Sequence, residues 1–91
     1  RVMVLRLRLI HEELSEFEEA ETKEEIADAL ADLLYVVFGT CVSYGIPIDE
    51  VFKEVHRSNM TKSTRLDQYG KTIKGEDYES PKIEEILRRE E

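Results

Sequence analysis

The sequence lacks the features that several classes of protein require. Its one cysteine, Cys41, cannot form an internal disulfide, which fits a reducing cytoplasm. No apolar run reaches the roughly 18 residues of a membrane span, and no signal-peptide pattern is visible. We therefore expect a cytoplasmic protein that has no membrane partner. Because the chain starts at Arg1 directly in an apolar pattern, we also expect that some N-terminal residues precede it.

The scarcity of histidine and cysteine argues against two common kinds of metal site. Zinc sites need clustered His and Cys side chains, which the chain lacks. A di-iron carboxylate bundle needs Glu-x-x-His pairs, and neither His11 nor His56 has a glutamate three residues before it. The net charge of −8 further argues against a nucleic-acid polymer as partner, because phosphate binding needs clustered Lys and Arg.

The spacing of apolar residues indicates helices. Over residues 2–20 they recur three and four positions apart, at Met3, Leu7, Ile10, Leu14 and Phe17. Thr22 and Glu25 have the spacing of a capping box, so a second helix is expected over about residues 23–44, ended by Gly45.

The rest of the chain predicts two more helices separated by a loop. Pro47 opens a third helix, which should end near Thr61. Residues 62–80 break the helical period and contain two glycines, so an extended loop is expected there. Ser80 and Pro81 have the residue types of an N-cap and a first helical position, which predicts a short last helix.

The composition of the second helix indicates that the bundle needs further copies of the chain. Between residues 26 and 42 it is apolar on nearly every face, so it should be buried on all sides. One short chain offers too few partners for that burial. We expect an all-α fold, a small antiparallel helical bundle of three main helices and a short C-terminal one, formed by a single domain over residues 1–91 and completed by homo-oligomerisation to a dimer or tetramer.

Two pairs of carboxylates lie within these apolar helices. Glu13 and Glu16 share one face of the first helix, where Glu12 also reaches Glu16. Asp28 and Asp32 share one face of the second helix. If the two helices pack antiparallel, the acidic faces meet and offer only oxygen ligands, which suit Mg²⁺ or, as a substitute, Mn²⁺.

Other acidic residues have simpler explanations. Glu18, Glu19, Glu21 and Glu24 are expected on the solvated surface. Glu25 lies on the same stripe as Asp28 and Asp32, but it already has a structural role as the capping partner of Thr22. Asp32 is flanked by apolar residues that leave it little chance of a solvated position, which favours a functional role.

Four blocks of sequence, in order, resemble one family. They are "EELSE" at residues 12–16, "DALADLLYVVFGTCVSYGI", "VHRSNMTK" and "GKTIKGEDY", and together they cover almost the whole chain. They resemble the MazG-like all-α nucleoside triphosphate pyrophosphohydrolases, in particular the small phage- and bacterial-type branch. The superfamily also contains phosphoribosyl-ATP pyrophosphohydrolase. Its members cleave between the α and β phosphates with Mg²⁺, giving a monophosphate and pyrophosphate.

The resemblance implies roles for the acidic residues. Glu13, Glu16 and Asp32 would be metal ligands, and Glu12 a ligand or the catalytic base that orients water. The family's second motif is usually Glu-x-x-Asp, but Ala29 stands three residues before Asp32. Two substitutes exist: Asp28 with Asp32, or "EIAD", in which Glu25 and Asp28 form the motif. Asp28 with Asp32 is preferred, which makes Asp28 the fourth metal ligand, and Glu25 remains a possible outer group.

Residues 53–74 form a basic segment, which carries Lys53, Arg57, Lys62, Arg65, Lys71 and Lys74 against only Glu54 and Asp67. The resemblance also implies a role for this segment. Asn59, Lys62, Lys71 and Lys74 resemble the region of the family that contacts phosphate, and such lysines would neutralise charge on the departing pyrophosphate. A solvated loop is the alternative for the lysines. Tyr78 would either stack on a base or hold the loop in place.

Three functions follow in order of preference. The first is a Mg²⁺-dependent pyrophosphohydrolase that acts on a nucleoside triphosphate or deoxynucleoside triphosphate in nucleotide-pool control. The second is phosphoribosyl-ATP pyrophosphohydrolase. The third is a non-enzymatic acidic helical module that binds a partner protein. In the first two, metal bound only to the folded state should stabilise the protein, which separates them from the third.

Overall fold

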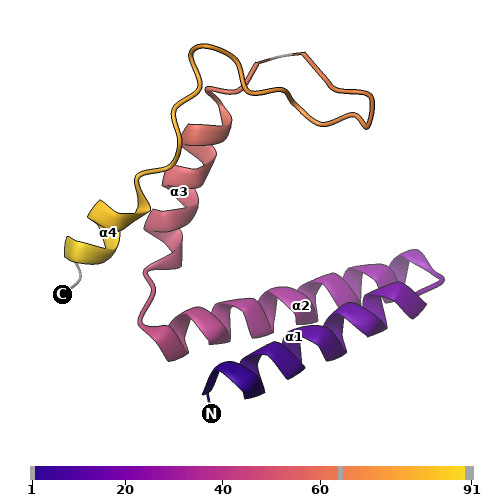
Figure 1. Ribbon diagram of the computed structural model, residues 1–91. Helices are drawn as coiled ribbons and strands as arrows, with labels where there is room; N and C mark the ends of the chain where they lie inside the picture. The colour runs from indigo at the N-terminus through magenta and orange to yellow at the C-terminus, as the bar shows by residue number, and fades with distance from the viewer. Residues whose placement is uncertain (1, 64, 90–91) are drawn as a thin grey trace. The chain divides into compact units, whose positions relative to one another are not determined.

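A computed structural model describes residues 2–63 and 65–89, which form four helices and no strand (Figure 1). The helices are α1 (Val2–Glu19), α2 (Lys23–Tyr44), α3 (Ile48–Asn59) and α4 (Ile83–Arg89). The expected all-α class is therefore confirmed over the described residues. The chain divides into two compact units, Arg1–Ile46 and Pro47–Glu91, each of which is described by itself below.

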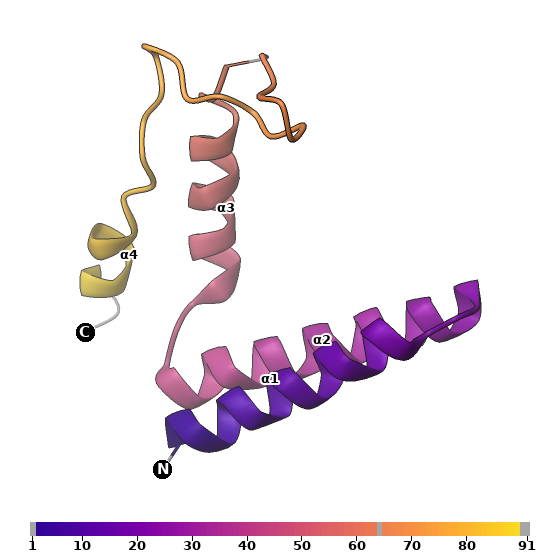
Figure 2. The same cartoon turned by 45° about the vertical axis from the view of Figure 1, so that its right-hand side comes forward.

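The first unit is an antiparallel pair of helices, with α1 and α2 side by side along their length (Figures 1 and 2). The capping box at the start of α2 is confirmed: Thr22 Oγ1 accepts from the Glu25 backbone N–H, and Glu25 Oε1 accepts from the Thr22 N–H. At the other end Gly45 has φ 67°, a left-handed conformation that suits glycine. Local capping signals thus set both ends of α2.

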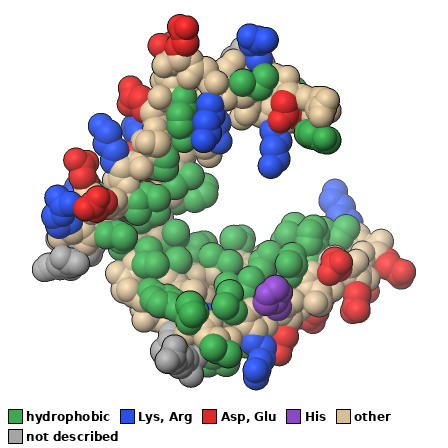
Figure 3. Space-filling view, viewed as in Figure 1, with side chains coloured by type: hydrophobic (Ala, Val, Ile, Leu, Met, Phe, Trp, Pro, Cys, Tyr) green, Lys and Arg blue, Asp and Glu red, His purple; other side chains and the backbone are tan. Residues whose placement is uncertain are grey.

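Most of the apolar surface of this unit is exposed. Ala29 and Cys41 are the buried residues of α2, whereas many large side chains on both helices are exposed, including Met3, Leu5, Leu7, Leu34, Phe38 and Val42. Figure 3 shows hydrophobic side chains gathered along one side of this helix pair. The expectation that α2 is buried on all sides is therefore not met within one chain.

By length and composition α2 could cross a membrane, and it is the one such helix in the part of the chain that the structure describes. An 18-residue window within it has a mean hydropathy of 1.6, although charged residues interrupt its apolar run. Core helices of soluble proteins pass the same test. The window also includes Asp28 and Asp32, which are costly at the centre of a bilayer.

Arg6 ties the open ends of the two helices together. Its Nε donates to Thr40 Oγ1 at 3.0 Å and its Nη2 donates to the Val36 carbonyl at 3.0 Å. The guanidinium lies across Gly39, where a Cβ atom would come within 2.6 Å of Nη2. The glycine within α2 thus gives room for an arginine that links α1 to α2.

The second unit contains α3 and α4, which lie against each other. The third helix ends at Asn59, close to expectation, but the last helix begins at Ile83 and not directly after Ser80 and Pro81. The reason is that the cap comes from another helix. Glu54 of α3 accepts the backbone N–H of Lys82 at 2.7 Å, the role expected of the Ser80 side chain.

The segment between α3 and α4 is more ordered than an extended loop. Residues 65–73 form a short hairpin, in which Ile73 N donates to the Arg65 carbonyl, and Ser63 N donates to the Ile73 carbonyl. At its tip, Asp67 Oδ1 accepts the backbone N–H groups of Tyr69 and Lys71. An aspartate whose side chain closes a turn in this way is a signal that the sequence contains.

Candidate metal-binding active site

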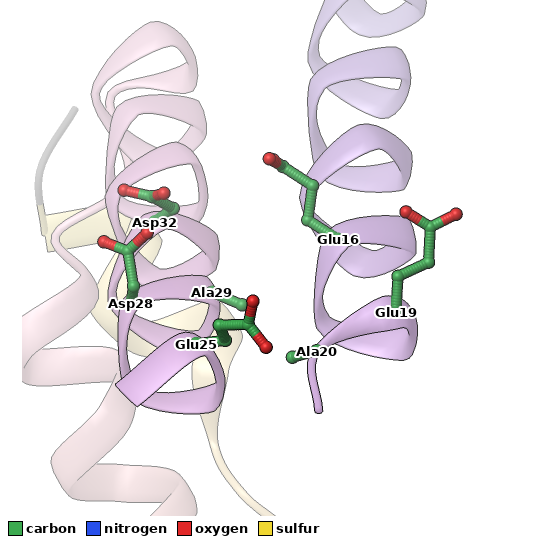
Figure 4. A pocket seen from close by; sticks show the side chains of 7 residues that line it. All are labelled: Glu16, Glu19, Ala20, Glu25, Asp28, Ala29 and Asp32. Atoms are coloured by element: carbon green, nitrogen blue, oxygen red, sulfur yellow. The ribbon is translucent and has the colours of Figure 1, made fainter. Parts of the chain in front are cut away.

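A pocket of about 290 Å³ lies between the C-terminal part of α1 and the N-terminal part of α2 (Figure 4). Because the helices are antiparallel and joined by a short connection, residues 16–20 face residues 25–32. The pocket is lined by Glu16, Glu19 and Ala20 from α1 and by Glu25, Asp28, Ala29 and Asp32 from α2. The structure thus brings together three of the four predicted metal ligands, Glu16, Asp28 and Asp32.

The side chains in this pocket differ in direction. Glu16 extends from α1 toward α2, whereas Asp28 and Asp32 lie one helical turn apart on α2 (Figure 4). Glu19 is directed away from α2 in the same view, in agreement with the surface role expected for it. Asp32 is exposed in this chain, although apolar neighbours predicted the opposite, because several of those neighbours are exposed as well.

Glu13, the fourth predicted ligand, has an unusual environment. Its Oε2 atom is buried and has no hydrogen-bond partner among the described residues. The pKa of Glu13 is raised from 4.5 to about 7, first because a proton on Glu13 can be shared with the Glu16 carboxyl group, and then by desolvation and the negative charges of Glu16, Asp32 and Glu12. Glu13 therefore joins residues of both helices into one electrostatic cluster.

This cluster fits a divalent cation in its chemistry. It offers only carboxylate oxygens, and a positive charge would relieve the repulsion that raises the pKa of Glu13. In the described part of the chain, no group of three or more His, Cys, Asp or Glu side chains is already arranged to hold a metal ion. Like charges without a cation repel one another, which works against their convergence on one point. The ligand set stays a prediction.

Glu25 takes a different role from its neighbours. Its carboxylate accepts the backbone N–H groups of Glu21 and Thr22 at 2.9 and 3.1 Å, and these bonds lower its pKa. Although Glu25 lines the pocket, its Oε1 atom is thus occupied by capping. The Asp28 carboxylate does not cap the start of α2, so Asp28 suits the predicted role of fourth metal ligand better than Glu25 does.

Glu12, the predicted catalytic base, is exposed on α1 and contributes to the negative potential at Glu13. Ala29 was noted in the sequence as a departure from the family motif. Its side chain is 5% exposed and lies in the contact between the helices, at the floor of the pocket. A small residue there keeps α1 and α2 close.

The predicted substrate-binding residues all lie in the second unit. Asn59 ends α3, Lys62 is half-buried just before the hairpin, and Lys71 and Lys74 are exposed. Lys74 Nζ lies 5.0 Å from the centre of the Tyr78 ring, a cation–π contact. This contact favours the second of the two roles expected for Tyr78, that of holding the loop.

Comparisons with known proteins agree with the resemblance. A family described as phosphoribosyl-ATP pyrophosphohydrolase matches residues 1–59, which include the acidic cluster and α3. A relative from Komagataella pastoris, a histidine biosynthesis trifunctional protein, is 39% identical over 75 residues. The match covers 82% of this chain, but the chain spans about 9% of the length of that relative. The family match ends before Lys62, so the hairpin lies beyond it.

Proposed function

Since this chain belongs to the phosphoribosyl-ATP pyrophosphohydrolase family, we propose that it hydrolyses phosphoribosyl-ATP between the α and β phosphates and releases pyrophosphate. The observation that carries this proposal is the acidic cluster around Glu13, which lies between α1 and α2 inside the matched residues. A perturbed, partly desolvated carboxylate in such a cluster is typical of a functional site.

The residues of the cluster divide into two tasks. Glu13, Glu16, Asp28 and Asp32 would hold Mg²⁺, with Mn²⁺ as a substitute; the chemistry supplied by the ion when bound is activation of water and neutralisation of phosphate charge. Glu12, which is exposed beside them, would orient the attacking water and accept its proton.

The basic residues of the second unit would bind the leaving group. Lys62, Lys71 and Lys74 carry positive charges that would neutralise the pyrophosphate, and Asn59 would donate a hydrogen bond to it. Among the described residues, none of the three lysines forms an ion pair with a carboxylate. Their charges are therefore not offset by a carboxylate in the part of the chain that the structure describes.

Two findings favour phosphoribosyl-ATP over a free nucleoside triphosphate as substrate. One is the description of the matching family, and the other is the histidine biosynthesis protein among its relatives. The sequence blocks alone favoured the nucleotide-scavenging activity, which becomes the second candidate. A cytoplasmic location agrees with the single buried cysteine and stays a prediction.

A direct assay distinguishes these substrates. The protein with Mg²⁺ should release pyrophosphate from phosphoribosyl-ATP at a kcat/KM at least about tenfold above that for any common nucleoside or deoxynucleoside triphosphate. Pyrophosphate is measured by a coupled assay, and the matched control is the same protein with a chelator. A higher kcat/KM for a free triphosphate would support the second candidate. Folded protein that hydrolyses neither substrate class would contradict both.

We propose further that the α1–α2 unit associates with copies of itself. Large apolar side chains are exposed along both helices, and apolar side chains gathered on one side of a helix pair are typical of an interaction surface. The exposed apolar residues of α1 and α2 can pack against the same two helices of a second copy, which gives a four-helix bundle. The exposed surface supports a dimer or a tetramer equally.

Placing one charged side chain in the exposed apolar surface of α2 tests whether this surface forms the contact between copies. Leu34 is 54% exposed on α2, and Leu34→Glu should convert the protein to a smaller species in analytical ultracentrifugation. Lys23→Gln, which changes the net charge by the same −1 at the polar start of α2, should leave the assembly intact. A wild-type protein that sediments as a monomer at micromolar concentration would contradict the proposal.

A further inference from the structure

A polar network joins the two ends of the loop between α3 and α4. Ser58, the least exposed residue of the described chain at 1%, donates from Oγ to the Glu79 carbonyl at 2.7 Å. The Glu79 N–H donates to Thr61 Oγ1 at 2.8 Å, and Thr61 Oγ1 donates to the Ser58 carbonyl at 2.7 Å. The end of α3 and the segment that leads to α4 are thus held together at the base of the loop.

Arg57 reinforces this junction with charge. Its Nε and Nη2 donate to both carboxylate oxygens of Glu54 at 2.9 and 2.8 Å, and its Nη1 donates to Glu79 Oε1 at 3.0 Å. The second carboxylate oxygen of Glu54 also accepts the Lys82 N–H. We call Glu54, Arg57, Ser58 and Glu79 the clasp. A bidentate arginine fixes geometry as well as charge.

The clasp leaves Arg57 little capacity to bind substrate itself. One positive guanidinium lies between two carboxylates, so the three charges sum to a negative value. Bonding to Arg57 and to the Lys82 N–H lowers the pKa of Glu54 to about 2, so this partner stays ionised at neutral pH. A phosphate would have to displace an already neutralised ion pair. Arg57 is therefore suited to an anchoring role.

Within the loop that the clasp closes, residues 62–74 carry a net positive charge, and the acidic Glu76 and Asp77 follow them. The basic side chains of residues 62–74 are Lys62, Arg65, Lys71 and Lys74. The acidic residue of this segment, Asp67, is engaged by the backbone N–H groups of the turn. Among the described residues, none of these four basic side chains pairs with a carboxylate. The hairpin therefore presents positive charge on a backbone held at both ends.

We propose that Arg57 and the clasp are positioning elements, which hold the basic hairpin ready to receive the phosphates of the substrate. This inference rests on the proposed function for its substrate. A loop of this length without anchors would lose much conformational freedom when it binds. Tying its ends together in advance removes part of that cost, which lowers KM without changing the chemical step.

Arg57→Met keeps the length of the side chain and removes the ion pairs. It should raise KM for phosphoribosyl-ATP about tenfold while kcat stays within about threefold of the wild type. Arg57→Lys, which keeps the charge, should restore part of the loss. The matched control is Glu84→Gln, which removes an exposed ion pair with Arg88 on α4 outside the clasp and should leave KM unchanged.

A second measurement does not need activity. Amide hydrogen exchange over residues 62–78 should be faster in Arg57→Met than in Glu84→Gln, while exchange in α1 and α2 is the same in both. If no substrate is hydrolysed by the wild type, the proposed function fails, but faster exchange still supports the clasp as an anchor of the hairpin. Unchanged exchange and unchanged KM would overturn the inference.

Two other results also test the positioning role of Arg57. A large fall in kcat with an unchanged KM would mean that Arg57 contacts the reacting phosphate, which contradicts a positioning role. If Arg57→Met does not fold, Ser58→Ala is used instead, because it removes one hydroxyl bond and leaves the ion pairs. It should show the same rise in KM and in exchange on a smaller scale, and its failure to do so would count against the clasp.

Discussion

Asp32→Asn is expected to reduce the rate of phosphoribosyl-ATP hydrolysis by about two to three orders of magnitude, as loss of a preorganised charged group at a phosphoryl site does. The same substitution should raise the melting temperature of the protein in the presence of a chelator. Asp32 is one of the charges that raise the pKa of Glu13, so its neutralisation relieves repulsion in the metal-free cluster. Activity and stability should therefore change in opposite directions.

The control for this experiment is Glu18→Gln, which also removes one negative charge from the first unit. Glu18 is exposed on α1 and does not line the pocket. Its substitution should leave the rate within about twofold, since it changes only a solvated surface charge. Equal effects of the two variants, or a lower melting temperature for Asp32→Asn in the chelator, would contradict the acidic cluster as the catalytic centre.

Stability of the metal-free protein should fall as the pH rises from 4.5 to about 7. The pKa of Glu13 is raised from 4.5 to about 7 in the folded chain, so the folded state binds this proton more tightly than the unfolded state does. The contribution of Glu13 is complete below pH 4.5 and is lost as the pH approaches about 7. Chemical denaturation at a series of pH values in this window, with a chelator, measures it.

Mg²⁺ should reverse this trend. A carboxylate must lose its proton to bind the ion, so Mg²⁺ affinity should increase as the pH rises toward about 7, and with it the stability gained from the ion. Glu25 and Glu54, whose pKa values are lowered, lose their stabilising contributions only as the pH falls below their ordinary 4.5, outside this window.

The control for the pH dependence is Glu13→Gln, which has no proton to release. Its stability without metal should lack the part of the slope that belongs to Glu13, and Mg²⁺ should stabilise it less than it stabilises the wild type. If Glu13→Gln and the wild type show the same pH dependence and the same response to Mg²⁺, Glu13 is not a ligand.

Local signals explain which parts of the fold could be predicted from sequence. Thr22 with Glu25 and the left-handed Gly45 set the ends of α2 by interactions within a few residues, so their spacing in the chain is sufficient. The predicted start of α4 was wrong because the residue that caps this helix, Glu54, lies on α3, 28 residues before Lys82. Only tertiary structure brings that carboxylate to the Lys82 N–H.

The candidate site shows the same division. Helical spacing correctly paired Glu13 with Glu16 and Asp28 with Asp32, and the short connection placed the pairs near each other. It could not show that one oxygen of Glu13 is buried without a partner, because this depends on how α1 packs on α2. Arg57 belonged to the basic segment by charge, and only its contacts to Glu54 and Glu79 reveal an anchoring role.

The buried position of Cys41 gives the protein a natural chemical reporter. It is the one thiol of the sequence and is 8% exposed on α2, so a thiol reagent reaches it readily only when the packing around α2 opens. The labelling rate then measures how often that opening occurs, without any engineered dye site. Comparing this rate with and without Mg²⁺ would report, from a residue outside the pocket, whether an ion bound to the acids restrains both helices.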